Sequence, residues 1–276
     1  AGQARGLDPN AIPETAMNLL QRLTGLDRSI DLRLPSNLFA LVAALIAGAI
    51  VVVGRGSISE VIASAGWAFT SWALGRELDP DRPLTAALAS SAVLLALLVF
   101  PEARGSAAVT VTLVLMLCAR AGFNSTGRAL KIGDELLIAI APIGAQLLTG
   151  LPLGLLGISS LTALYVRRGT WWSVTLAALG IAGVFFAPAR DGAALMFLAL
   201  LTIGALSYAR RPPKSQTDNK GFYDPRAWRV MHAGIWAGAA VAALLSPPLV
   251  WGSLAVTGVL ALILERLGRG KPRRSV

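Results

Sequence analysis

Ten apolar runs, each 15 to 18 residues long, occupy most of this chain between residues 37 and 264. They are residues 37–54, 58–75, 84–100, 106–122, 135–149, 152–166, 171–188, 193–209, 230–246 and 249–264. Such runs predict helices that cross a bilayer, the shorter ones with help from polar flanks or long arginine side chains. Only 14% of the residues are charged, against about 25% in soluble domains. The sequence therefore predicts an all-α fold, a polytopic integral membrane helix bundle of about ten helices.

The fifth and sixth runs leave the number of crossings open. As one helix, residues 135–166 would be about 48 Å long, which is too long for a single crossing. The sequence "TGLPLG", from Thr149 to Gly154, offers a break, because glycine frees the backbone and Pro152 suits the start of a new helix. Two crossings are therefore expected here.

The basic residues test this count. With ten helices and the N-terminus inside, 22 of the 25 Lys and Arg residues lie on the cytoplasmic side, and only Arg55, Arg104 and Arg190 lie outside. This is the asymmetry that the positive-inside rule describes. Merging the fifth and sixth runs would move the basic loop 210–229 to the outside. We therefore expect both termini to be cytoplasmic, and the short spans and compact loops are typical of a bacterial inner (plasma) membrane.

The chain divides into three segments by composition. Residues 1–35 predict a short amphipathic helix on the cytoplasmic surface. Residues 36–266 form the transmembrane domain, and residues 267–276 form a basic tail. Within the domain, residues 37–149 and 152–264 each hold five spans and begin on opposite sides, so the two halves would be inverted.

This plan of ten spans with both ends inside, in 276 residues, resembles the drug/metabolite transporter architecture with its paired five-helix halves. The likeness is one of layout, and it implies a transport function. No binding residue is carried over from it.

Few cofactor sites are compatible with the composition. One cysteine, Cys118, and one histidine, His232, exclude a disulfide framework, a Cys-rich zinc site and a haem with two histidine ligands from this chain. No cofactor is indicated. A net charge of +10 would suggest nucleic acid in a soluble protein. Beside membrane spans it indicates anionic lipid headgroups as the partners instead, and no nucleic acid is expected.

Ionisable side chains are missing from the middle of the spans, unlike in most ion-coupled transporters and proton pumps. His232 is interpreted as a polar residue at the start of the ninth span. The tryptophans, Trp67 and Trp72 among them, are interpreted by default as belts at the membrane interface, with packing against lipid, pigment or a partner as the alternative. These features disfavour a proton relay or a buried metal centre.

Glycine and proline interrupt the central pair of spans. Interrupted helices often mark the site of a transporter, because unwound backbone binds a solute without charges. The candidate solute pathway is Pro142, Gly144, Gln146, Gly150 and Pro152. Gln146 would supply a hydrogen bond. The alternative is tight packing with a helix kink.

The cytoplasmic loops hold a second candidate, a polar site. Its residues are Glu77, Asp79, Asp81, Arg120, Asn124, Arg128 and Asp134. Acids two apart suit Mg²⁺, and the loop after Cys118 suits a phosphate. No second Asp-rich box and no Walker sequence accompany them, so no metal site is assigned. The alternative is a turn, in which Asp81 caps the third helix before Pro83 and Arg76 lies at the end of the second.

Three functions follow from these patterns. The leading one is a transporter-like protein for a small uncharged or amphiphilic solute. The second is a non-catalytic accessory subunit of a larger membrane complex, with protein partners. The third is a lipid-modifying enzyme at the cytoplasmic face, which requires the charged loops to converge around a metal.

Overall fold

A computed structural model describes residues 33–100, 106–125, 131–149, 160, 163 and 224–243. Its helices are α2 (Pro35–Val53), α3 (Ile58–Leu78), α4 (Pro83–Val99), α5 (Ser106–Phe123), α6 (Ile132–Thr149) and α10 (Pro225–Ala243). Within these residues all regular structure is helical and there is no strand, which confirms the all-α class. The six helices coincide with the first five and the ninth apolar runs.

Several predicted segments lie outside the described residues. The seventh, eighth and tenth runs do so entirely, and of the sixth run only Ser160 and Ala163 are described. The predicted amphipathic segment 1–35 is described only from residue 33, and the basic tail 267–276 is not described.

Local chemistry sets most helix starts. Proline stands at the beginning of α2 and of α4, where its missing N–H costs no hydrogen bond. A capping box starts α3: the Ser57 N–H donates to Glu60 Oε2 at 2.6 Å, and the Glu60 N–H donates to Ser57 Oγ at 3.3 Å. Arg55 adopts a φ of 56° in the preceding turn, which reverses the chain sharply.

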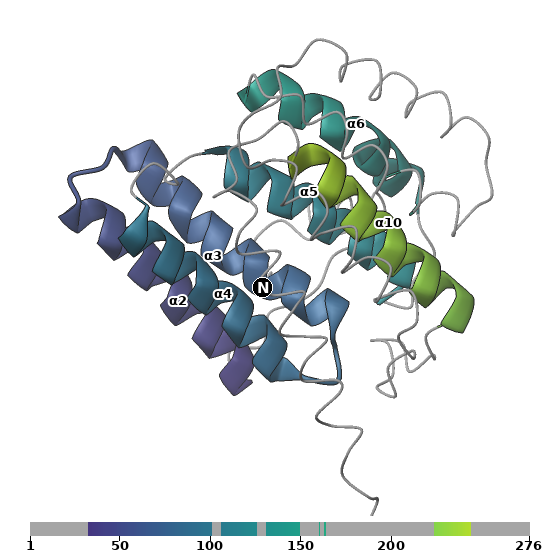
Figure 1. The fold of residues 1–276 in the computed structure, drawn as a ribbon, viewed down its shortest axis with the longest axis horizontal. Coiled ribbons are helices and arrows are strands. Elements are labelled where there is room, and N and C mark those ends of the chain that lie inside the picture. Colours follow the sequence, from purple (N-terminus) through teal and green to yellow (C-terminus); the bar gives the residue numbers. More distant parts are fainter. Residues whose placement is uncertain are drawn as a thin grey trace, which may run out of the picture.

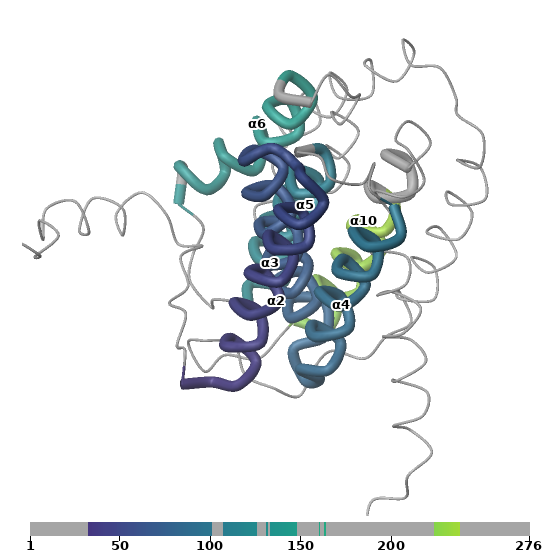
Figure 2. Tube along the Cα trace, turned by 90° about the vertical axis from the view of Figure 1, so that its left-hand side faces the viewer, coloured from purple at the N-terminus to yellow at the C-terminus, as the bar shows by residue number. Residues whose placement is uncertain are grey.

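Helix α3 lies at the centre of the described bundle. It contacts α2, α4 and α5, and both α6 and α10 pack against α5. Figure 1 shows α2 and α4 on one flank of α3, with α5, α10 and α6 on the other. The tube in Figure 2 shows α2, α3 and α5 running along one another.

The helix ends show that α2 and α3 run in opposite directions, as do α5 and α10, whereas α3 and α5 run in the same direction. In the last turn of α3, Arg76 donates to Asn37 Oδ1 at the start of α2, over 3.1 Å. The ring of Phe123, the last residue of α5, lies 4.4 Å from the ring of Trp228 near the start of α10. The starts of α2 and α10 and the ends of α3 and α5 therefore gather at one end of the bundle, which we name the charged end.

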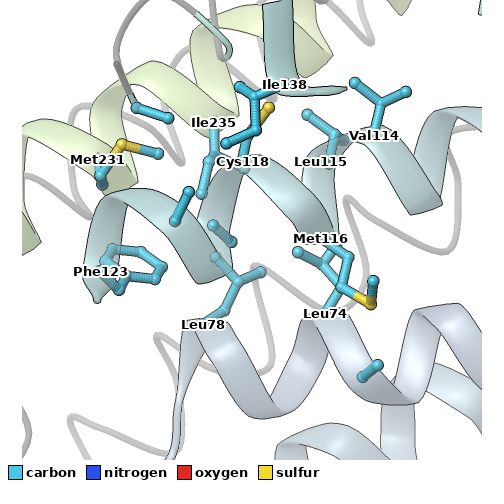
Figure 3. Close-up of a cluster of buried hydrophobic side chains, with 14 of the residues drawn as sticks. Leu74, Leu78, Val114, Leu115, Met116, Cys118, Phe123, Ile138, Met231 and Ile235 are labelled. Carbon is cyan, nitrogen blue, oxygen red and sulfur yellow. The ribbon is translucent and has the colours of Figure 1, made fainter. Parts of the chain in front are cut away.

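Small residues line the helix contacts. A Cβ atom placed on Gly75 of α3 would lie 2.8 Å from the Cα of Ala86 on α4, so the two backbones approach as closely as glycine permits. Larger apolar side chains fill the space between α3, α5, α6 and α10. Figure 3 shows Leu74 and Leu78 of α3 directed toward α5, with Met231 and Ile235 of α10 on its other side.

The outward faces carry large apolar side chains. The exposed ones on α2, α4 and α6 include Leu41, Leu45, Val52, Leu95, Leu98, Ile140 and Leu147. Among the described helices, α2 alone is long and apolar enough, by length and composition, to cross a membrane, and Pro83–Val99 and Ala107–Phe123 are apolar but shorter. Helices α3 and α6 carry charged side chains in their terminal turns.

Candidate functional site

A buried ion pair joins α3 to α5 at the charged end. The Nε atom of Arg120 donates to Glu77 Oε1 over 3.0 Å, and the Glu77 side chain is 2% exposed. The sequence placed Glu77 in a turn. Helix α3 instead continues to Leu78, so Glu77 lies on a helical turn that faces α5. A charge-assisted hydrogen bond of this kind offsets the cost of removing both groups from water.

Asp79 holds the turn between α3 and α4. Its Oδ2 atom accepts a hydrogen bond from Thr85 Oγ1 at 3.1 Å and lies 3.7 Å from a guanidinium nitrogen of Arg82. The prediction that Asp81 caps the next helix is wrong. Arg82 occupies the N-cap position without a side-chain capping bond, and Asp81 is exposed. Asp79 ties the turn to the start of α4 from inside, a role that spacing alone did not reveal.

The predicted phosphate loop follows α5. Asn124 adopts a φ of 54° there, a conformation that asparagine tolerates better than most residues. Asp134 is fully buried and accepts the N–H of Lys131 at 2.9 Å. Asp134 and Glu135 lie in the first turn of α6, which begins at Ile132 rather than at residue 135, where the apolar run began. Arg128 lies outside the described residues.

Three acids of the charged loops contact different partners among the described residues. Glu77 is paired with Arg120, Asp79 with Thr85 and Arg82, and Asp134 with backbone. In the described ranges no group of three or more His, Cys, Asp or Glu side chains lies close enough together to hold a metal ion.

The predicted solute pathway falls on α6. The helix continues through Pro142, which is buried, and is described as far as Thr149; the rest of the predicted break, up to Gly154, lies outside the described residues. Within the described part of the chain, a Cβ atom added to Gly144 would have no atom within 4 Å. Gln146 is half-buried. Gly150 and Pro152 lie outside the described residues.

His232 lies deeper than the sequence indicated. Helix α10 begins at Pro225, so His232 is about two turns inside it and fully buried. Its ring lies 5.0 Å from Phe123 and 4.6 Å from Trp228. The sequence signal for the earlier helix start was Asp224 followed by Pro225, an acid and then a proline. In the structure Asp224 Oδ1 accepts the N–H of Arg226 at 2.7 Å.

Neutral polar side chains of α3 form a site that sequence reasoning missed. Ser64, Trp67 and Ser71 are 1 to 3% exposed, and Trp72 is 5% exposed. The interpretation of Trp67 and Trp72 as interface belts is wrong, because both pack inside the bundle. In the part of the chain that the structure describes, the hydroxyls of Ser64 and Ser71 and the indole N–H groups of Trp67 and Trp72 have no hydrogen-bond partner. The sequence signal that could have revealed this site is the spacing of Ser64, Trp67 and Ser71 in "SAGWAFTS". They are three and four residues apart, which places them on one side of a helix.

The chain matches no protein-family model, no curated protein and no solved structure. Two features of the described residues therefore carry the functional argument. One is the set of paired charges at the charged end, and the other is the neutral polar surface buried on α3.

Proposed function

We propose that this chain is a multi-pass inner-membrane protein that moves or holds a small uncharged or amphiphilic solute. The observation that carries the proposal is the division of polar groups along α3. Charged groups lie at its ends and are paired, as Glu77 is with Arg120, whereas Ser64 and Ser71 lie buried between them. A pathway lined this way offers hydrogen bonds without a counter-charge, which suits a neutral solute.

The outward faces support the membrane part of the proposal. Leu45 on α2 is 65% exposed, and Leu147 on α6 is 79% exposed, while alanines such as Ala43 and Ala47 are buried inside. Large apolar side chains outside and small ones inside would leave a wide hydrophobic surface in water. In a bilayer the same surface contacts lipid, and the small residues allow close helix packing.

The direction of α10 supports the ten-span plan. Helix α10 starts at the end of the bundle where α5 ends, because Trp228 packs on Phe123. Helix α5 is the fourth apolar run and α10 is the ninth. A plan of ten spans places the end of α5 and the start of α10 together on the cytoplasmic side. Merging the fifth and sixth runs would reverse α10 and separate these residues. In the ten-span plan both termini are cytoplasmic, and the basic loops and tail lie against anionic lipid.

Transport by purified protein in vesicles tests the proposal. Stopped-flow light scattering would follow the entry of urea, glycerol and xylitol, with choline chloride as the charged comparison. We expect at least one neutral solute to enter faster than into empty vesicles, and choline chloride to enter no faster. Gln146→Leu should abolish this entry in vesicles that hold the same amount of protein. Unchanged entry in that variant would remove Gln146 from the pathway, and no entry in the wild type would contradict transport of these solutes.

The exposed face of α6 favours a second function, a non-catalytic subunit of a membrane complex. Leu136, Ile140 and Leu147 are exposed beside Gly144, where another helix could approach closely. Extraction in a mild detergent followed by native mass measurement separates the two functions: a stable hetero-complex supports the subunit. The lipid-modifying enzyme loses support, because Glu77 and Arg120, which it needs for metal and headgroup, neutralise each other.

A further inference from the structure

We propose that Ser64, Trp67 and Ser71 form the solute site, and that its ligand is a neutral molecule carrying carbonyl, ether or hydroxyl oxygens. We name these three residues the α3 seam. The inference rests on the proposed function, and it adds the location of the site and the chemistry of the ligand.

The α3 seam faces the interior of the bundle. Its residues are three and four positions apart, so they share one side of the helix. Trp67 packs in a cluster with Ala47 of α2 and Ala108 of α5. A ligand at the α3 seam would therefore lie among helices, away from the surrounding lipid.

The serine hydroxyls of the α3 seam differ from the threonine hydroxyls on the same and neighbouring helices. Thr70 donates to the carbonyl of Gly66 at 2.8 Å, and Thr112 donates to the carbonyl four residues before it at the same distance. This is the ordinary arrangement for a hydroxyl on a helix. Within the described residues Ser64 and Ser71 make no such bond, and the Trp67 Nε1–H, like those of Trp72 and Trp236, has no acceptor. Burying a polar group without a partner costs stability, which a ligand that bonds to it would offset.

The donors define the ligand. The indole N–H of Trp67 can only donate, and serine hydroxyls donate as well as accept, so the ligand must present acceptor oxygens. The charges flanking the α3 seam are engaged elsewhere: Glu60 in the capping box, and Glu77 with Arg120. Arg76, the cation nearest along α3, donates to Asn37 Oδ1 and lies over the Trp72 ring, so among the described residues of α3 no cation is left to serve an anion at the α3 seam. The apolar surroundings of Trp67 favour an apolar body on the same molecule, which describes a neutral amphiphile.

Titration with 1-monooctanoylglycerol tests the site. This probe has an ester carbonyl, hydroxyls and a short apolar tail, and octanoate supplies the same tail with a negative charge. In full-length protein labelled with ¹⁵N at the indole nitrogens, the Trp67 signal is assigned by its loss in Trp67→Phe. We expect the neutral probe to shift this signal downfield, and octanoate to bind at least tenfold more weakly. No shift with the neutral probe, or equal binding of octanoate, overturns the proposal.

Serine variants separate a binding role from a packing role. Ser71→Ala should weaken binding of the neutral probe at least tenfold while the melting temperature without probe stays equal or rises, because the lost hydroxyl had no partner. Ser90→Ala is the matched control, since its hydroxyl donates to the carbonyl of Ala68 at 2.8 Å. It should lower the melting temperature and keep the affinity. Unchanged affinity in Ser71→Ala overturns the proposal.

The vesicle assay distinguishes failure of the α3 seam as the solute site from failure of the proposed transport function. If Ser71→Ala carries neutral solutes at the wild-type rate, the proposed function stands and the α3 seam is not its site. If wild-type protein moves no solute but the probe shifts Trp67, the site stands and the protein holds its ligand rather than moving it.

Discussion

Glu77 and Arg120 are 43 residues apart in sequence, and their side chains meet at 3.0 Å between α3 and α5. The contact joins the C-terminal ends of α3 and α5, which run parallel, at the point where the bundle changes from buried neutral residues to charged loops. It also explains the cluster of charge from Arg76 to Arg82: one of its acids reaches a partner helix, while Asp79 holds the turn.

Removing one member of this pair should destabilise the protein more than removing both. Arg120→Leu or Glu77→Leu leaves a buried charge without its partner, which costs ~3–5 kcal/mol in the free energy of unfolding. The double variant should recover most of that loss. Denaturant unfolding in detergent micelles measures all three, and additive losses in the double variant would contradict a direct pairing. Arg55→Gln, at the exposed turn after α2, is the control and should change little.

Gly75 and Gly144 should respond in opposite ways to alanine. Gly75→Ala places a methyl group against the Ala86 backbone, 2.8 Å from its Cα, and should lower stability by ~1–3 kcal/mol. Gly144→Ala meets no atom of the described residues within 4 Å, and should raise stability by ~0.5–1 kcal/mol through the better helix propensity of alanine. Thermal unfolding of the two variants side by side checks this. Equal effects would mean that α3 and α4 are not in close contact.

Loss of the capping box should weaken the start of α3. Ser57→Ala removes the acceptor for the Glu60 N–H, and should lower the free energy of unfolding by ~1 kcal/mol. Ser91→Ala serves as the control, because that hydroxyl is exposed and bonds only within its own helix. Hydrogen exchange at the first turn of α3 reports the local effect. Exchange equal to that of wild type in Ser57→Ala would contradict the assigned cap.

Cysteine labelling should place Asp81 and Ser215 on the same side of the membrane. Cys118 is the single cysteine and is buried, so Cys118→Ala provides a background for one added cysteine at a time. Asp81→Cys and Ser215→Cys should react with an impermeant thiol reagent from the cytoplasmic side, and Ser59→Cys from the other. If Ser215→Cys reacts together with Ser59→Cys, the ten-span plan is wrong.

The positions of the described helices could be predicted because their signals are local. An apolar run bounded by Pro35, by Ser57 and Glu60, or by Pro83 fixes a helix within a few residues of its ends. Where the prediction failed, the local signal was ambiguous. The end of α3 was placed before Glu77 because a charge usually marks the limit of an apolar helix, and the start of α10 was placed after Asp224–Pro225 because only the apolar run was read.

The sequence by itself determined an all-helical class and the order of its apolar segments, because hydrophobicity and capping act between residues that are close along the chain. Only the tertiary structure decided that Glu77 pairs with Arg120, that His232 packs against the rings of Phe123 and Trp228, and that Trp67 is buried between helices. Each of those facts depends on which helix faces which. That choice is made by packing between segments many residues apart, and a single sequence carries no local signal for it.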